Sequence, residues 1–194
     1  MIADGGGILI ADGGSFTTSG AMSQGIYSKG DVTVTNASVN ALNAKAAVLK
    51  GNNTITLSGT ILEGKETTDA VPYNIVLFSD EKDIGTMGTQ HFDVRGGSLI
   101  SHKGGMFYVT ATHGKISLNG TAITMDDPAA NLITVAGNDG ANGWGTPGRN
   151  GGHVELVADN QVLTGNISVD SISNINMTLK NNSTFNGIIS IVPN

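Results

Sequence analysis

Residues 32–39 read VTVTNASV and residues 55–62 read ITLSGTIL, and one rule describes both stretches. Two apolar residues stand two positions apart, a Gly or Asn follows the second of them by two positions, and another apolar residue lies three positions beyond. FDVRGGSL at 92–99 and ISLNGTAI at 116–123 follow the same rule, and weaker copies begin at Val154 and Met177. Recurrence of one short pattern along a chain indicates a protein built from structural repeats.

The distance between copies sets the size of the repeat. The copies begin at positions 32, 55, 92, 116, 154 and 177, so the successive steps are 23, 37, 24, 38 and 23 residues. The three short steps predict a coil of about 23 residues, which is typical of a β-solenoid. The two long steps predict insertions of about 14 residues, at 78–91 and at 137–152.

Alternation of apolar and polar residues within each copy predicts β-strands, because side chains in a strand point to opposite faces in turn. One internal column would be formed by Val32, Ile55, Phe92, Ile116, Val154 and Met177, and the next by Val34, Leu57, Val94, Leu118, Leu156 and Leu179. The Gly or Asn of each copy suits a left-handed residue at a tight corner, where a β-branched side chain would be strained. A second apolar cluster precedes each copy, so we expect two or three strands per coil, and no 3.6-residue period indicates a helix.

The chain is therefore predicted to be all-β: a single-stranded, right-handed parallel β-helix, or solenoid, with coils of about 23 residues and two loop insertions. A β-sandwich or meander is the competing architecture, and it would explain the strands but not the near-constant step. We expect one domain over residues 1–194, with 1–24 as an N-terminal partial coil or cap and 25–194 as regular coils.

Two stretches carry a resemblance to a known family. GIYSKGDVTVTNASVNA at 25–41 and the stretch from Trp144 to Gly187 resemble coils of right-handed parallel β-helix proteins of the pectin-lyase-like fold, as in bacterial secreted or surface adhesins and autotransporter passengers. The resemblance covers residues 25–194. It implies the fold and an extracellular or cell-surface location, and it leaves the activity open, because this fold carries lyases, hydrolases, adhesins and structural stalks.

Composition and charge narrow the range of partners. The chain has 16 acidic and 10 basic residues, a formal net charge of −6, so nucleic acid is not an expected partner. It has no Cys, which excludes disulfides and thiolate metal sites. The sequence contains no apolar run of about 18 residues, so it predicts no membrane span. The N-terminal stretch MIADGGGILIADGGSF lacks the features of a signal peptide, so we expect a longer native chain whose secretion signal lies outside this sequence.

The two insertions are the most informative places for function. Both interrupt the coil between the apolar cluster and the next copy, so they are predicted to project from one side, and insertions on one side of a repeat protein commonly form its binding surface. We expect ligand contacts from Asp80, Glu81, Asp83, His91, His113, Asp139, Trp144 and Arg149. Trp144 could stack on a sugar ring, or it could fold back as a lid over the core.

Other groupings of polar residues were weighed for chemistry. Asp93 and Glu155 are predicted to face outward two coils apart, about 9–10 Å from each other, near the upper end of the spacing of an inverting glycosidase pair. A solvated strand face is the alternative for this pair. His91 and His153 are predicted at equivalent places in their coils. We expect no catalytic residue, no metal site and no cofactor.

These observations predict a non-catalytic, adhesin-like or glycan-contacting module whose partner is a polysaccharide or a host or cell-surface glycan. The alternatives are a polysaccharide lyase or hydrolase, an inert structural stalk, and an ice-binding surface based on outward threonines. Self-association by end-to-end stacking is also expected, because an uncapped solenoid end exposes unpaired strand edges.

Overall fold

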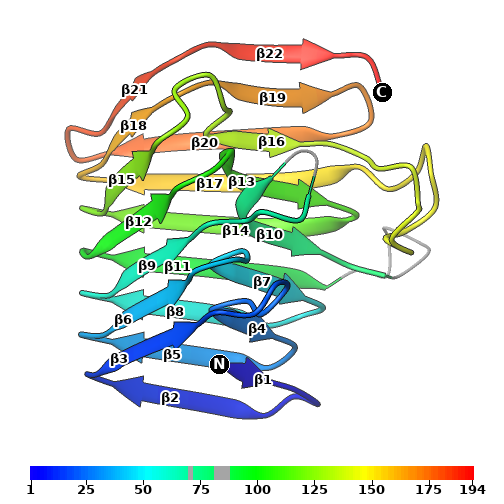
Figure 1. Cartoon of the computed structure of the whole chain (residues 1–194). Coiled ribbons are helices and arrows are strands. Elements are labelled where there is room, and N and C mark those ends of the chain that lie inside the picture. The colour runs from blue at the N-terminus through cyan, green and yellow to red at the C-terminus, as the bar shows by residue number, and fades with distance from the viewer. Residues whose placement is uncertain (70–71, 81–87) are drawn as a thin grey trace.

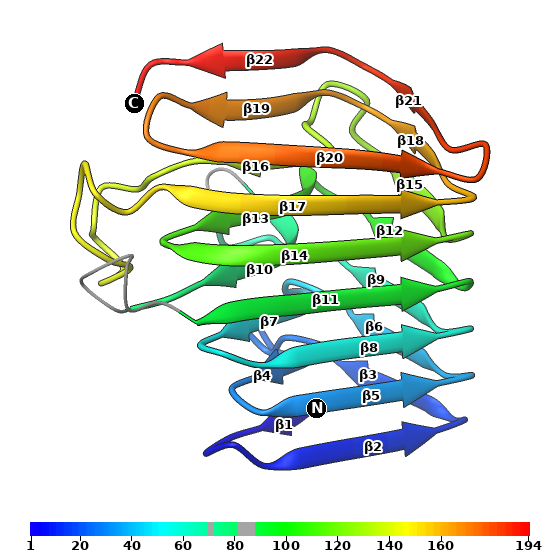
Figure 2. The same ribbon diagram turned by 180° about the vertical axis from the view of Figure 1, so that it is seen from behind.

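The computed structural model describes residues 1–69, 72–80 and 88–194. These residues form 22 β-strands and no helix, and so contain no helical segment that could cross a membrane. In Figure 2 the strands nearest the viewer run from left to right, the return strands lie behind them, and the chain climbs from its N-terminal to its C-terminal end, which defines a right-handed coil. The prediction of an all-β parallel β-helix is confirmed.

Each full coil contributes one strand to each of three faces, named A, B and C, in which all neighbouring strands are parallel (Figure 1). Face A consists of β1 (Ile2–Ala3), β4 (Ile26–Ser28), β7 (Ala47–Lys50), β10 (Tyr73–Phe78), β13 (Gly105–Thr110), β16 (Ile133–Val135), β19 (Ile167–Asp170) and β22 (Ile189–Val192). Face B consists of β2 (Ile8–Asp12), β5 (Asp31–Thr35), β8 (Thr54–Ser58), β11 (Thr89–Arg95), β14 (Thr112–Asn119), β17 (Gly152–Asp159) and β20 (Asn174–Lys180). Face C consists of β3 (Ser15–Thr18), β6 (Ser38–Ala41), β9 (Ile61–Gly64), β12 (Ser98–Ser101) and β15 (Ala122–Met125), and the pair β18 (Val162–Thr164) and β21 (Thr184–Asn186) continues it.

The core lies between the three faces and is built from stacked apolar columns. Strand pairing places Val32, Ile55, Phe92 and Ile116 in one column and Val34, Leu57, Val94 and Leu118 in the next, as predicted, and all eight side chains are buried. Phe92 of face B meets Phe107 of face A edge-on, with ring centroids 5.7 Å apart. This arrangement of two aromatic rings is a favourable one, so the pair ties face A to face B across the core.

The predicted columns are wrong at β17. Ile116 lies beside Leu156 and not beside Val154, and the second column shifts in the same way, from Leu156 to Ala158. Val154, Leu156 and Ala158 are all buried. A shift of two residues therefore keeps every apolar side chain in the core, and the alternating pattern alone could not choose between the two registers.

The corner between faces B and C is formed by left-handed residues, as predicted. Positive φ angles occur here at Gly13, Asn36, Gly59, Gly96, Gly120, Asn160 and Asn181. The N–H of each of the first six donates to the carbonyl of the last residue of the face-B strand in the next coil, as Asn36 does to Ser58 at 2.8 Å. The corners thus stack on one another as regularly as the strands.

Both long connections leave the coil at the corner between faces A and B. Residues 79–88 join β10 to β11, and residues 136–151 join β16 to β17. The second connection, yellow in Figure 1, reaches away from the coil on the side where β10 ends. The two insertions therefore share one corner, two coils apart.

The ends of the solenoid expose apolar side chains and strands with an unpaired edge. Face A ends in β1 and β22, and face B ends in β2 and β20. Ile8 is 76% exposed at one end and Ile191 is 80% exposed at the other. Such edges offer free N–H and C=O groups to another chain.

Candidate functional site

The outer side of face A is apolar in its middle coils. Tyr27, Val48, Val76 and Tyr108 lie side by side on adjacent strands and point away from the core. Val48 is only 5% exposed and Val76 only 1%. Because a solvated sheet face normally carries polar residues, this part of face A is a covered surface.

The insertion at 136–151 supplies part of that cover. Its Trp144 stacks on Phe78 of β10, with ring centroids 4.4 Å apart and an interplanar angle of 29°. The indole thus reaches back two coils from the strand that precedes the insertion. One side of Trp144 packs on the protein, as expected of a lid, and the side chain nevertheless stays half-buried.

Two tyrosines extend the aromatic surface beside Trp144. Tyr73 and Tyr108 stack with ring centroids 5.1 Å apart. The Tyr73 hydroxyl donates to Thr134 Oγ1 at 2.9 Å, and the Tyr108 hydroxyl donates to the carbonyl of Gly137 at 3.1 Å. Burial raises the pKa of both phenols, so they remain neutral hydrogen-bonding groups at physiological pH.

Hydrogen bonds hold the backbone of the Trp144 loop in place. The side chain of Asn150 is fully buried, and its Nδ2 donates to the carbonyls of Asn138 and Trp144 at 2.9 and 3.0 Å. Asn138 Nδ2 donates to the same Trp144 carbonyl and to Thr110 Oγ1 of β13. Gly145 has a φ of +71°, and a Cβ there would lie 2.7 Å from Asn150 Cβ. The loop is therefore built to present Trp144 in one position.

An ion cluster built on the buried side chains of Lys45 and Glu66 forms another wall. Lys45 is 8% exposed, and its Nζ pairs with Glu66 Oε2 at 2.7 Å and with Asp69. Burial opposes the ionisation of Glu66, but hydrogen bonds from Lys45 and Thr68 outweigh it and lower the pKa of Glu66 to about 2. Glu66 is thus an anion at physiological pH and poorly suited to donate a proton.

These walls enclose two adjoining hollows of about 180 and 500 Å³, and both are lined by Trp144, Val76, Asn142, Lys45 and Asp69. We call them together the aromatic groove. Its apolar surface is formed by Tyr27, Val48, Tyr73, Val76, Phe78, Tyr108 and Trp144, and its polar rim by Lys45, Asp69, Asn138, Asp139 and Asn142. A concave apolar surface with a few convergent polar groups is the usual form of a small-ligand site.

The structure brings only some of the predicted ligand contacts to this groove. Trp144 and Asp139 line it. Asp80 pairs with Lys50 Nζ at 2.6 Å, just beyond the end of β10, and this hydrogen bond lowers the pKa of Asp80. Arg149 is exposed in the same loop as Trp144 but does not line the groove. Glu81 and Asp83 lie outside the described residues.

The two predicted histidine contacts lie elsewhere. His91 in β11 and His113 in β14 belong to face B, whereas the groove lies on face A. The prediction that His91 and His153 occupy equivalent places is wrong. His153 pairs with His113, and His113 pairs with Thr89, so the residue of β11 in the same column as His153 is Thr89 and not His91. The cause is the two-residue shift of β17 described above.

The carboxylates of Asp93 and Glu155 do not stand in one column two coils apart, as their predicted geometry required. Asp93 lies beside Ser117, which lies beside Val157, whereas Glu155 lies beside Lys115. Glu155 Oε2 is 3.6 Å from Lys115 Nζ. The two carboxylates stand in different columns of face B, which contradicts the predicted pairing and matches the alternative of separate acids on a solvated strand face.

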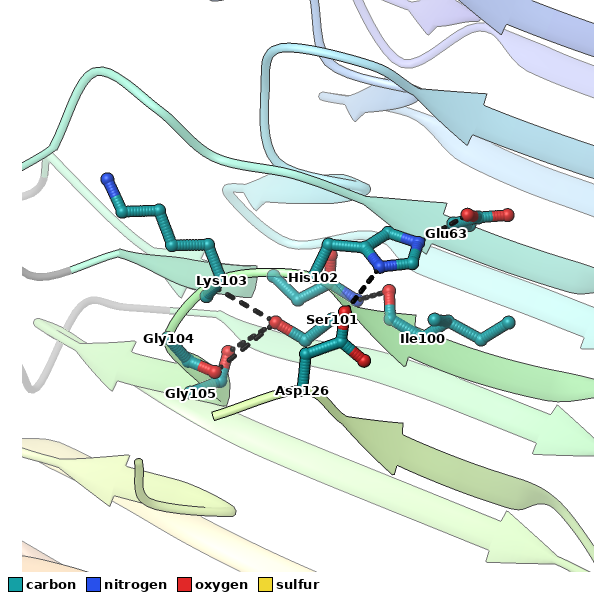
Figure 3. A network of polar contacts seen from close by, with 9 residues as sticks. Glu63, Ile100, Ser101, His102, Lys103, Gly104, Gly105 and Asp126 are labelled. Atoms are coloured by element: carbon teal, nitrogen blue, oxygen red, sulfur yellow. Dashed lines mark hydrogen bonds and ion pairs between the residues drawn. The ribbon is translucent and has the colours of Figure 1, made fainter. Parts of the chain in front are cut away.

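A second polar network lies at the corner between faces C and A (Figure 3). The imidazole of His102 stands between Glu63 of the preceding coil and Asp126 of the following one, with Nδ1 2.8 Å from Asp126 Oδ2 and Nε2 in contact with Glu63. The hydrogen bonds to Asp126 and Glu63 raise the pKa of His102. The hydroxyl of Ser101 beside it donates to the carbonyl of Lys103 at 3.1 Å, and the carbonyl oxygens of Gly104 and Gly105 lie 3.3 and 3.4 Å from the same Oγ. Sequence reasoning missed this cluster because its members are far apart in the chain.

The tyrosines of the groove were missed as well, although a signal for them exists. Face-A strands contain runs such as IVLF at 75–78 and MFYV at 106–109 that are apolar at consecutive positions, without the alternation of the face-B strands. A continuous apolar run indicates a strand that is covered on both sides.

We compared the chain with protein-family models, curated proteins and solved structures, and none of the three comparisons finds a match.

Proposed function

We propose that this chain is a non-catalytic module that binds a glycan in the aromatic groove, as part of a secreted or cell-surface bacterial β-helix protein of the pectin-lyase-like kind. The observation that carries the proposal is the arrangement of Trp144, Tyr27, Tyr73 and Tyr108 along the two adjoining hollows of the aromatic groove. Aromatic rings bind the apolar C–H faces of sugar rings, and tyrosine and tryptophan add a polar edge. The bacterial and extracellular origin rests on the resemblance carried by residues 25–41 and 144–187.

The polar rim favours a neutral sugar chain. Lys45 contributes one positive charge to the groove, against three negative charges from Glu66, Asp69 and Asp139. This excess of negative charge repels polyanionic glycans such as polyuronates. The amide of Asn142 and the carboxylates of Asp69 and Asp139 can bind sugar hydroxyls, because together they supply both donors and acceptors.

The groove is better suited to binding than to hydrolysis. Glycoside hydrolysis needs one carboxylic acid whose pKa is raised, so that it can protonate the leaving oxygen. The buried carboxylate of the groove, Glu66, instead has its pKa lowered to about 2 and is held by Lys45 and Thr68. This supports retention of a glycan without cleavage.

The test is a panel of neutral, acidic and amino polysaccharides, in which retention of the glycan and release of reducing or unsaturated chain ends are measured together. We expect retention of a neutral glycan, no released ends, and about tenfold weaker binding in Trp144→Ala. Tyr27→Ala tests the other end of the groove, at a residue that lies on a strand and not in the Trp144 loop. Arg149→Ala is the matched control, because Arg149 is an exposed residue of the Trp144 loop, and this variant should bind normally.

Three outcomes would contradict the proposal. Released chain ends would favour a lyase or hydrolase, and retention that survives both Trp144→Ala and Tyr27→Ala would place the site elsewhere. An absence of retention across the panel would favour a structural stalk.

A further inference from the structure

Two histidines stand directly opposite each other on the outer side of face B. The register of β14 and β17 pairs His113 with His153, and paired residues of adjacent parallel strands project from the same side of a sheet. Their ring centroids are 4.9 Å apart with an interplanar angle of 36°. Both side chains are partly exposed, so an ion in solution can reach them.

This spacing matches two ligands of one metal ion. Two imidazoles on a tetrahedral zinc ion, each with a Zn–N bond of about 2.0–2.1 Å, have ring centroids about 5 Å apart. The strand pairing therefore sets the separation that a shared ion needs, before any ion is bound.

A side chain of the following coil also contacts the pair. Asn174 of β20 places its side-chain amide 2.6 Å from His153 Nδ1. Asn174 Nδ2 faces this atom and donates to it, which fixes the orientation of the imidazole ring beside His113.

The surroundings determine the class of ion. Lys115 and Glu155 line the same hollow of about 300 Å³, and because they pair with each other their charges largely cancel beside the histidines. Within the described residues no third His, Asp or Glu completes a ready-made metal cluster. Solvent would therefore supply the remaining ligands, and two imidazoles favour zinc, copper or nickel over calcium or magnesium.

We infer that His113 and His153 form a two-histidine binding site for a divalent transition-metal ion on face B. This site goes beyond the proposed glycan function, because it shares no residue with the aromatic groove. An ion bound by both rings would link the adjacent strands β14 and β17.

The test is calorimetric titration of the whole chain, without a polyhistidine tag, with Zn²⁺ at pH 7.5. We expect one ion per chain, at least tenfold weaker binding in His113→Gln and in His153→Gln, and weaker binding as the pH is lowered, because protons compete with the ion for the imidazole nitrogens. Zn²⁺ should also raise the melting temperature of the wild type but not of the double variant, because an ion that binds only the folded state stabilises it.

His91→Gln is the matched control, because His91 lies on the same face of the sheet beside Lys115 and outside the pair. It should leave zinc binding unchanged. The inference is overturned if His91→Gln weakens binding as much as His113→Gln, if the double variant binds Zn²⁺ as well as the wild type, or if the wild type binds none at 1 mM. None of these results bears on glycan retention, so the two proposals fail separately.

Discussion

At the scale of single residues, Asn150 is the main support of the Trp144 loop. Its buried Nδ2 donates to two loop carbonyls, and its Oδ1 accepts from the N–H of Asn138. Trp144 is the only tryptophan of the chain, so its fluorescence reports directly on the aromatic groove.

Asn150→Ala should therefore lower the free energy of unfolding by about 1–3 kcal/mol, because the carbonyl of Asn138 loses this donor and that of Trp144 loses one of its two. It should also shift the emission of Trp144 to longer wavelength, as the indole leaves Phe78 for water. Denaturant unfolding and fluorescence spectra measure the two effects. Asn142→Ala, an exposed residue of the same loop, should change neither, and an unshifted spectrum in Asn150→Ala would show that the loop is held by other contacts.

His102 gives the protein a dependence on pH. Because its pKa is raised in the folded chain, its protonated form is stabilised by Asp126 and Glu63. That contribution is complete below the pKa of an unfolded histidine, about 6.5, and disappears as the pH rises through the higher pKa of the folded state. The network is partly exposed, so its size should be about 1 kcal/mol or less.

His102→Gln should thus destabilise the protein more at pH 6 than at pH 8.5, in denaturant unfolding at low ionic strength. The same substitution made in a Glu63→Gln, Asp126→Asn background should show no such difference, because the carboxylate partners are gone. If His102→Gln lowers the unfolding free energy by the same amount at both pH values, His102 contributes by packing alone.

At the scale of elements, the corner after β11 separates two effects of glycine. Gly96 and Gly97 both have a φ of +63°. A Cβ on Gly96 would meet nothing within 4 Å, whereas a Cβ on Gly97 would lie 2.1 Å from the carbonyl oxygen of Thr60 in the preceding coil. The first position carries only backbone strain, and the second also carries the close approach of two coils.

Gly96→Ala should accordingly cost about 1–2 kcal/mol of unfolding free energy, the strain of a left-handed non-glycine residue. Gly97→Ala should cost at least about 3 kcal/mol, because the backbone of one coil must move away from its neighbour. Urea unfolding of the two variants makes the comparison. Equal losses would mean that the coils separate at this corner with little resistance.

At the scale of the whole molecule, the exposed ends predict association of this 194-residue chain. Ile189 and Ile191 lie on β22, whose outer edge is unpaired. Sedimentation velocity should show an assembly that grows with concentration, because strand edges and apolar side chains at the ends pair with another copy.

Ile189→Lys with Ile191→Lys should suppress that assembly, since charges on an edge strand oppose pairing. Ile61→Lys is the control, because Ile61 is an exposed residue on the side of the solenoid, in a strand with neighbours on both edges. Association that survives the double variant, or that Ile61→Lys abolishes, would place the contact on the side of the solenoid.

The sequence by itself determined the repeat, the strand alternation and the left-handed corners. These features are local: Val32, Val34 and Asn36 specify two inward side chains and a turn within five residues, and the next coil repeats them at Ile55, Leu57 and Gly59. The spacing between copies of the repeat also predicted that the two insertions lie at the same corner of the coil.

Only the tertiary structure decided the register of β17, and with it the pairing of His113 with His153. Its inward residues Val154, Leu156 and Ala158 satisfy the core in either register, so the choice depends on how the whole strand packs against β14. The aromatic groove was likewise decided by tertiary structure, because Trp144 meets Phe78 only when the 136–151 loop folds back across two coils. A local pattern specifies which way a side chain points, and what it then meets is set by contacts between residues far apart in the chain.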